Sequence, residues 1–145
     1  MQSNVLFISH VDLVLYNLII NSVLVGVILI TQIVNYPLFK YVKTDFTGFH
    51  KKYVKKIGFV VAPIMIIEVI IISGIILRDF NNNLIQLITI LLLIIWTSTF
   101  FIQVPIHRQL SLGVKKKLNL LVYSNWVRTI CWILKLIISI MLFKL

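Results

Sequence analysis

Charged residues are scarce in this sequence, and acidic residues are almost absent. Only 12% of the 145 residues are charged, and only four of those are Asp or Glu, whereas a soluble domain carries about 25% charged residues. A single cysteine, Cys131, excludes an internal disulfide framework. The sequence has no phosphate-binding glycine loop, no dinucleotide-binding fingerprint and no serine-elbow motif, so the common classes of soluble enzyme have no support.

Long hydrophobic runs take the place of the missing charge. Hydrophobic residues make up 60% of the chain, and its mean hydropathy is +1.04. Four apolar segments are each long enough to cross a hydrocarbon core of about 30 Å as a helix, at residues 11–34, 57–77, 84–104 and 120–143. The connections are short, and no sequence repeat is evident. The sequence predicts an all-α polytopic membrane protein, an antiparallel bundle of four transmembrane helices that forms a single domain over residues 1–145.

Basic residues gather in two of the three connections. Residues 40–56 contain six lysines and one acid, and residues 105–119 contain one arginine and three lysines. No Lys or Arg precedes the first apolar segment. The positive-inside rule therefore predicts that both basic connections face the cytoplasm and that both termini lie outside. Attraction to anionic lipid accounts for the net charge of +10, so we expect the lipid bilayer as a partner and no nucleic acid.

Polar residues inside the apolar segments follow helical spacing. The last segment has a polar stripe at Asn125, Arg128, Thr129, Trp132, Lys135 and Ser139. The other three have stripes at Asn17, Asn21, Thr31 and Asn35, at His50 and Glu68, and at Thr89, Trp96, Thr99, Phe100, Gln103 and His107. An unpaired polar group facing lipid costs several kcal/mol. We therefore expect the stripes to face each other and to form a polar interior that is open or nearly open at its cytoplasmic end.

The predicted functional site lies in the cytoplasmic half of this interior. Its core is expected to be Asn35, His50, Glu68, Gln103, His107, Asn125 and Arg128. We expect His107 and Arg128 to border one cavity of about 300–1,000 Å³, with Asn125 or Gln103 between them. Trp96 and Trp132 lie deeper, where they either stack an aromatic substrate or fill the bundle core.

Glu68 lies near the middle of the second apolar segment, and the only other acid in these segments, Asp12, lies at the very start of the first. A buried charge in a membrane is costly, so a basic partner on the last segment is expected. Arg128 is the first choice, because a guanidinium binds a carboxylate bidentately, and Lys135 can share the same carboxylate. Such a pair can belong to a functional site, or it can simply hold the helices together.

His50 and His107 lie at the cytoplasmic ends of the second and third segments. Two imidazoles on adjacent helices can bind a metal or a haem iron, and this alternative is left open. Neither histidine belongs to a ligand-spaced motif. We therefore favour a hydrogen-bonding or acid–base role and predict no cofactor.

Prolines and aromatic residues predict local features. Pro37 and Pro105 are expected to end the first and third helices, and Pro63 to kink the second. Thr44 or Asp45 is expected to cap the second helix. An interfacial aromatic belt is expected at Tyr36, Tyr41, Tyr53, Tyr123 and Trp126.

Two stretches carry a resemblance to known proteins. "WTSTFFIQVPIHRQL" followed by "SNWVRTICW" resembles the paired signature of a family of small four-helix bacterial membrane proteins, and "QIVNYPLF" and "APIMIIE" fit the same pattern. More distantly, the pair is similar to the anthrone-oxygenase-like superfamily, whose third and fourth helices carry "VPLN" and "WNxxRT" stretches. The match covers Pro105, His107, Asn125, Arg128 and Thr129. This sequence has His107 where those members have Asn, and "NW" where they have "WN".

The resemblance implies a bacterial inner (plasma) membrane protein that oxidises a lipophilic aromatic or quinone-like substrate, as superfamily members oxidise anthrones without a metal or flavin. In this interpretation the substrate comes from the inner leaflet and lies between Trp96 and Trp132. His107 or His50 removes a proton, Arg128 and Asn125 stabilise the anion, and oxygen reacts with it directly.

A non-enzymatic role is the alternative. A transport, binding or assembly subunit would also use a polar core with paired charges, and the sequence has no dedicated nucleophile. The oxidoreductase hypothesis assigns catalysis to His50, His107, Asn125 and Arg128, and substrate binding to Asn35, Glu68, Trp96, Gln103 and Trp132. A homo-oligomer is compatible with either interpretation.

Overall fold

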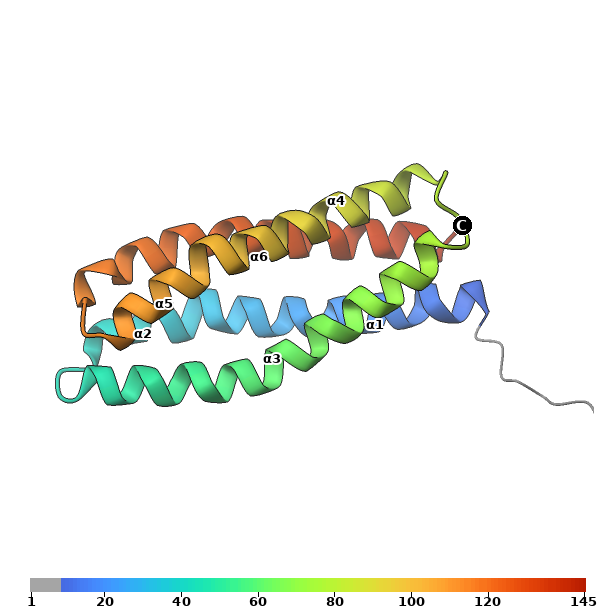
Figure 1. Ribbon diagram of the computed structural model, residues 1–145. Helices are drawn as coiled ribbons and strands as arrows, with labels where there is room; N and C mark the ends of the chain where they lie inside the picture. The colour runs from blue at the N-terminus through green and yellow to red at the C-terminus, as the bar shows by residue number, and fades with distance from the viewer. Residues whose placement is uncertain (1–8) are drawn as a thin grey trace, which may run out of the picture.

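The computed structural model describes residues 9–145, which form four long helical spans and no strand within that range (Figure 1). Each span is long and apolar enough to cross a membrane. The α-helices are α1 (His10–Ile30), α2 (Tyr36–Leu38), α3 (Phe46–Ile76), α4 (Asn83–Ser98), α5 (Val104–Ser111) and α6 (Leu118–Phe143). α1 and α2 belong to one span, and so do α4 and α5. The predicted all-α four-helix membrane fold is confirmed.

Side-chain caps set the starts of the first three spans. Ser9 and Asp12 form a reciprocal capping box at the start of α1, with Asp12 N donating to Ser9 Oγ at 3.1 Å. Asp45 caps α3 by accepting from Gly48 N at 3.0 Å, as the sequence predicts. The helix therefore begins well before its apolar run, which starts at residue 57, because lysine is a good helix former and the intervening basic residues stay helical.

The prediction that Pro37 and Pro105 end their helices is wrong. Both spans continue through the proline, and each passes through a π-helix just before it, at Thr31–Asn35 and Thr99–Gln103. A proline inside an α-helix removes one N–H donor and clashes with the preceding turn, and the wider π-turn relieves that conflict.

The two π-helices share one sequence spacing, which a search for longer repeats misses. "TQIVNYP" and "TFFIQVP" both read Thr, three residues, a side-chain amide, one residue, Pro. In both, the residue before the proline donates its backbone N–H to the carbonyl of the first threonine. The two spans run in the same direction through the bundle.

The first π-helix also shifts the helical phase. Regular α-helical spacing would continue the inward stripe of α1 to Asn35, whereas the extra residue of the π-turn brings Tyr36 inward. Tyr36 is 3% exposed, and Asn35 is only half-buried. The placement of Tyr36 in an interfacial belt is therefore wrong.

The four spans form a ring in which one seam is open. α1 packs along α3 and α6, and α4 packs along α6, whereas α3 and α4 meet over only a short stretch. Further along the same span, α5 contacts α3 near the connections at residues 42–45 and 112–114. Pro63 lies inside α3, and Figure 1 shows α3 bending along its length, as expected for an internal proline. We call the two contrasting contacts the α1–α6 seam and the α3–α4 seam.

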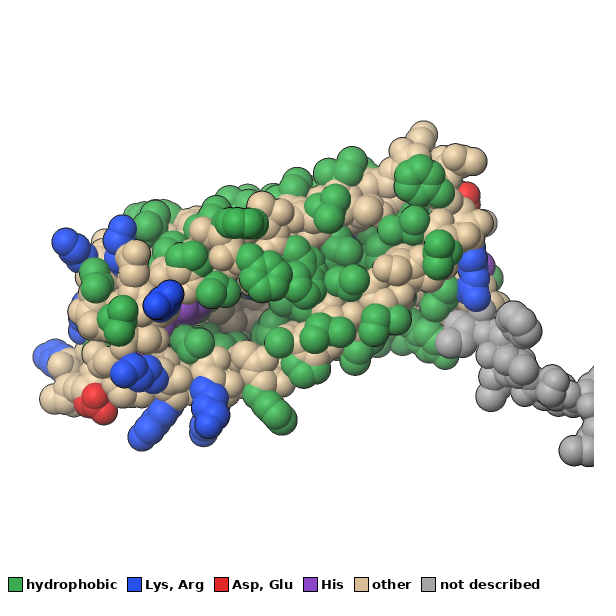
Figure 2. Space-filling model, in the orientation of Figure 1, with side chains coloured by type: hydrophobic (Ala, Val, Ile, Leu, Met, Phe, Trp, Pro, Cys, Tyr) green, Lys and Arg blue, Asp and Glu red, His purple; other side chains and the backbone are tan. Residues whose placement is uncertain are grey.

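The outer surface of the bundle suits a lipid bilayer. Exposed Ile, Leu, Val and Phe side chains cover all four spans, and lysine and arginine side chains gather at one end (Figure 2). That end carries the connections at residues 42–45 and 112–114, and we call it the basic end. Lys115 Nζ ties the two connections together by donating to Val42 O at 2.7 Å.

Candidate functional site

The deepest polar feature is an ion pair between Lys135 on α6 and Glu68 on α3. Both side chains are fully buried. The expected partner on the last segment is confirmed, but it is Lys135 alone, so the preferred pairing of Glu68 with Arg128 is wrong. Arg128 lies about two helical turns closer to the basic end than Lys135, out of register with the carboxylate.

A hydrogen-bonded cluster surrounds this ion pair. Ser139 Oγ accepts from Asn17 Nδ2 at 2.9 Å and from Asn21 Nδ2 at 2.8 Å, and donates to Lys135 O at 2.8 Å. We call Asn17, Asn21, Glu68, Lys135 and Ser139 the ion-pair cluster. It joins α1, α3 and α6 in the middle of the bundle, and Glu68 belongs to it, whereas the hypothesis had placed Glu68 in the substrate site.

A cavity of about 380 Å³ lies between the ion-pair cluster and the basic end. All four spans contribute to its wall, including Thr31, Tyr36, Gly58, Trp96, Thr99, His107, Arg128 and Trp132. Two of its lining residues, Ile66 on α3 and Phe100 beyond α4, are 52% and 55% exposed. The cavity therefore reaches the outer surface at the α3–α4 seam, and Figure 2 shows a hollow on this face with histidine at its edge.

Arg128 is the charged group of the cavity wall. Its Nη1 donates to Asn125 Oδ1 at 3.2 Å, its Nε has no hydrogen-bond partner, and its guanidinium lies 5.0 Å from the centre of the Trp132 ring. Within residues 9–145 no ion pair joins Arg128 to a carboxylate, and the buried carboxylate of Glu68 pairs with Lys135 instead. Arg128 is thus a buried cation without a carboxylate, 7% exposed, and such a cation attracts an anion strongly.

The side-chain amides of Asn125 and Gln32 form a chain of hydrogen bonds that ends at Arg128. Asn125 Nδ2 donates to Gln32 Oε1 at 2.7 Å, and Gln32 Nε2 donates to Val122 O at 3.0 Å. Gln32 lies within the first π-helix. Asn125, a predicted catalytic residue, does not line the cavity and contacts the guanidinium through its Oδ1. A catalytic role for Asn125 stays a prediction.

The two predicted histidines lie in one hydrogen-bonded row at the basic end of the cavity. His50 Nδ1 contacts Ser111 Oγ at 2.9 Å, His50 Nε2 contacts His107 Nδ1 at 3.1 Å, and His107 Nε2 contacts Tyr36 Oη at 3.0 Å. Tyr36 and His107 line the cavity, whereas His50 is fully buried behind them. We call Ser111, His50, His107 and Tyr36 the histidine row.

The remaining predicted residues divide between the cavity and its surroundings. Trp96 and Trp132 both line the cavity, and neither indole N–H has a hydrogen-bond partner. Gln103 is buried and donates to Ser124 Oγ at 3.0 Å, outside the cavity wall. Asn35 Nδ2 donates to Tyr53 Oη at 3.5 Å, and Asn35 is also outside the cavity wall.

Sequence reasoning missed Tyr36, Gln32 and Ser111. Gln32 follows Thr31 directly, so a polar stripe drawn over a wider angle of the first helix would have included it. The signal for Tyr36 was the proline directly after it, which marks a break in helical phase. Ser111 follows His107 by one helical turn, and that spacing could have identified it.

A metal or haem at His50 and His107 stays an open alternative to the prediction of no cofactor. Within residues 9–145 there is no group of three or more His, Cys, Asp or Glu side chains that could hold a metal ion. All four ring nitrogens of the two histidines already contact a polar partner. A metal ligand would therefore have to exchange one of those contacts for the metal.

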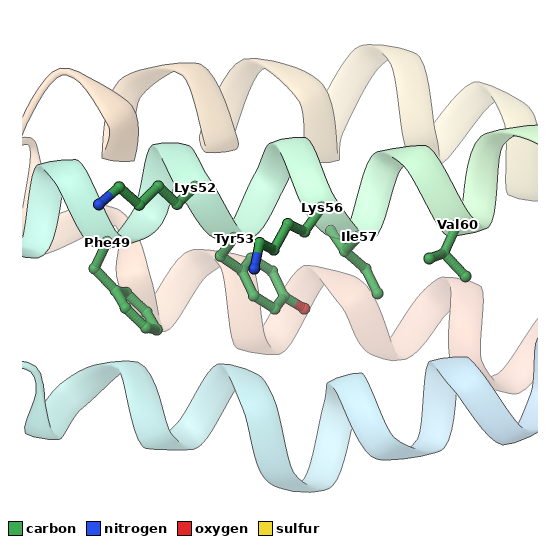
Figure 3. Close-up of a pocket in the computed structure, with 6 residues that line it drawn as sticks. All are labelled: Phe49, Lys52, Tyr53, Lys56, Ile57 and Val60. Carbon is green, nitrogen blue, oxygen red and sulfur yellow. The ribbon is translucent and has the colours of Figure 1, made fainter.

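A second depression, of about 460 Å³, lies on the outside of α3 (Figure 3). Every residue that lines it belongs to α3, from Phe49 to Val60. Lys52 and Lys56 extend across it, as lysines do at a membrane interface. It contains no predicted site residue, and we regard it as part of the lipid-facing surface.

Comparison with protein-family models, curated proteins and solved structures finds no match to this chain. The similarity to the anthrone-oxygenase-like superfamily therefore stays a prediction from the sequence stretches that carry it. Interpretation of the site depends on its own geometry: a largely apolar cavity that opens on the outer surface of the bundle, with Arg128 and the hydrogen-bonded pair of Tyr36 and His107 in its wall.

Proposed function

We propose that this protein is a membrane oxidoreductase that oxidises a lipophilic aromatic or quinol-like compound with molecular oxygen. One observation carries the proposal: Arg128, a buried cation without a carboxylate, faces the same cavity as the hydrogen-bonded pair of Tyr36 and His107. An anion site and a proton acceptor in one apolar cavity are what the deprotonation of a weakly acidic aromatic compound requires.

The substrate reaches the cavity from the bilayer through the α3–α4 seam. Small residues of α3, Gly58 and Ala62, line the cavity at this seam and are exposed. A Cβ built on Gly58 meets no atom within 4 Å, so the space beside it is free. An apolar opening in the side of a transmembrane bundle favours a lipid-soluble compound over a water-soluble one.

The chemistry begins with loss of a proton from a phenolic O–H or an activated C–H of the substrate. The proton passes to the Tyr36–His107 pair, and the electron pair stays on the substrate as an enolate-like anion beside Arg128. For an anthrone-type substrate the anionic carbon then adds O₂, and the peroxide takes back a proton. Loss of water leaves a C=O group, so the methylene carbon is oxidised and one O₂ is reduced.

Trp96 and Trp132 provide the aromatic surfaces against which such a substrate packs. Trp132 is fixed between Arg128 and the core, whereas Trp96 is half-buried beside Phe100, with ring centres 5.3 Å apart. The pair accounts for a preference for flat aromatic compounds.

We place the basic end at the cytoplasmic face of a bacterial inner membrane, in accordance with the positive-inside rule. Single cysteines at positions 116 and 82, in a Cys131→Ser background, test this orientation. An impermeant thiol reagent added to intact cells is expected to label position 82 and not position 116. The reverse pattern would invert the orientation and move the site to the outer half of the membrane.

The test of function uses the detergent-purified protein and anthrone as the probe. Oxygen uptake and anthraquinone absorbance report turnover, and quenching of tryptophan fluorescence reports binding. Gly58→Leu is expected to abolish both signals by filling the seam. Gly26→Leu is the matched control, because Gly26 also has open space beside it but does not line the cavity. Equal activity in the two variants, or no oxygen uptake by the unmodified chain, would contradict the proposal.

Ligand binding without turnover is the second candidate. The ring nitrogens of His50 and His107 are already paired, and a stable network of this kind also suits a binding or transport protein. In that case anthrone or a quinol quenches tryptophan fluorescence with the same dependence on Gly58, and no oxygen is consumed.

A further inference from the structure

We propose that the histidine row is a proton relay that connects the cavity with the basic end of the bundle. It runs from Tyr36 Oη in the cavity wall, through His107 and His50, to Ser111 Oγ at the last residue of α5. The three contacts of the row measure 2.9–3.1 Å, which are ordinary hydrogen-bond distances. The inference depends on the proposed function only for the source of the proton.

The row can be arranged in two ways without any charged ring. In the first, Tyr36 O–H donates to His107 Nε2, His107 Nδ1–H donates to His50 Nε2, and His50 Nδ1–H donates to Ser111 Oγ. In the second, each bond is reversed, and the Ser111 hydroxyl donates to His50 Nδ1. A neutral imidazole carries one N–H and one acceptor nitrogen, so both arrangements satisfy all four ring nitrogens.

Switching from the first arrangement to the second moves one proton. A substrate hydroxyl gives its proton to Tyr36 Oη as the Tyr36 proton moves to His107 Nε2. The Nδ1 proton of His107 moves to His50 Nε2, and the Nδ1 proton of His50 moves to Ser111 Oγ. Ser111 passes its own hydroxyl proton to water at the basic end. The bonds that break and form balance, and neither ring has to hold a charge in the apolar interior.

Aromatic rings shield the middle of the row. Phe46 stacks on His50 with ring centres 5.7 Å apart, and Phe39 meets it edge-on at 5.8 Å. His50 is fully buried, so water has no direct contact with it. The half-buried Ser111, in contrast, stands next to Leu112, which is 71% exposed. The row is therefore closed along its side and accessible at its ends.

The same row could instead serve only to join α5 to α2 and α3. The two roles differ in the tautomers of the rings. A purely structural row keeps one arrangement, whereas a relay populates both and exchanges between them. The chain has three histidines, and the third, His10, lies at the opposite end of the bundle, so the nitrogen signals of His50 and His107 can be assigned from single variants.

The first measurement is nitrogen NMR on the ligand-free protein labelled at histidine. We expect a coupling across the hydrogen bond between His50 Nε2 and His107 Nδ1, together with signals or exchange that report both tautomers of each ring. Tyr36→Phe is expected to leave the coupling and to fix the tautomer of His107. An absent coupling, or a single fixed tautomer in the unmodified chain, would overturn the relay whatever the enzyme does.

The second measurement is turnover of anthrone. His50→Gln keeps a hydrogen-bonding side chain but cannot relay a proton, and we expect a loss of kcat of about 100-fold, with a smaller loss for Ser111→Ala. Binding, measured by tryptophan quenching, is expected to stay unchanged, as are all properties of the control His10→Gln. Normal kcat in both variants would show that the row is only structural. A relay seen by NMR in a protein that oxidises nothing would contradict the proposed function and leave the relay standing.

Discussion

Two buried cations on the same face of α6 contrast sharply. Lys135 has no exposed surface and pairs with Glu68. Arg128, about two turns away, pairs with no carboxylate and faces a cavity. Their sequence surroundings are alike, since both interrupt an apolar helix, and only the neighbouring helices make them different.

The difference separates a charge that joins two helices from a charge that has no carboxylate partner and borders a cavity. The Lys135–Glu68 pair joins α6 to α3, and each of the two buried charges has the other as its counter-charge. Arg128 carries the same cost of burial without an internal partner. A bundle that needed Arg128 only for stability would have gained more from an apolar residue at this position.

The largest loss of stability is expected from breaking the ion pair between Lys135 and Glu68. Glu68→Gln keeps the shape of the side chain but leaves Lys135 buried without its counter-charge. The loss of unfolding free energy should approach the roughly 3–5 kcal/mol that a broken buried pair costs in soluble proteins. It should stay below that range, because polar groups of a membrane protein find other partners when it unfolds. Thermal unfolding in detergent measures the loss.

A double variant sharpens this prediction. Glu68→Gln combined with Lys135→Met removes both charges, and we expect most of the lost stability to return. Asp79→Asn, in the connection between α3 and α4, is the control for loss of an acid and should change nothing. Unchanged stability in Glu68→Gln would mean that the ion pair does not hold the bundle together.

The unpaired cation should show the opposite behaviour. Arg128→Gln is expected to leave the stability of the empty protein unchanged or slightly raised, because a buried charge disappears. Affinity for an anionic aromatic probe such as 2-naphthoate should fall about 10- to 100-fold, since a hydrogen bond to a charged group contributes roughly 1.5–3 kcal/mol. Arg108→Gln, exposed on the neighbouring α5, is the matched control. A destabilised Arg128→Gln with unchanged affinity would make Arg128 structural, like Lys135.

The smallest effect concerns the two tyrosines near the cavity. Tyr36→Phe removes one hydrogen bond of 3.0 Å to His107 and should lower stability by about 1 kcal/mol. Tyr53→Phe removes a longer contact of 3.5 Å to Asn35 and should lower it less. Chemical unfolding of both variants under the same conditions compares their free energies of unfolding. A larger loss in Tyr53→Phe would indicate that the row at Tyr36 contributes little to the fold.

Most of the fold follows from the sequence because the bilayer leaves few alternatives. Long apolar runs must be helical there, and polar stripes must face inward. The inward stripe of α6 is correct at every position, from Asn125 to Ser139. The predicted helix ends at Pro37 and Pro105 are wrong, because regular α-helical spacing includes no π-turn. The one extra residue of a π-turn changes the direction of every side chain that follows it in the helix.

The site was harder to predict, for reasons of register. Sequence spacing brings His107 and Arg128 to the same membrane level, and the structure places both in one cavity wall. Sequence spacing cannot decide which of the two cations on the α6 stripe meets Glu68, because that depends on the relative height of α3 and α6 in the bundle. The periodicity of a single helix gives no measure of that height.

The shared spacing of the two π-helices suggests a history for the molecule. α1 with α3, and α4 with α6, are two hairpins that run in the same direction, each with its threonine, amide and proline at equivalent places. Duplication of one ancestral hairpin would produce this arrangement, with two equivalent contacts between the halves. One of these contacts became the tightly packed α1–α6 seam, and its counterpart, the α3–α4 seam, parted around the cavity. On this view the cavity arose because one of the two equivalent contacts opened while the other stayed packed. The two hairpins, produced as separate chains, are expected to associate.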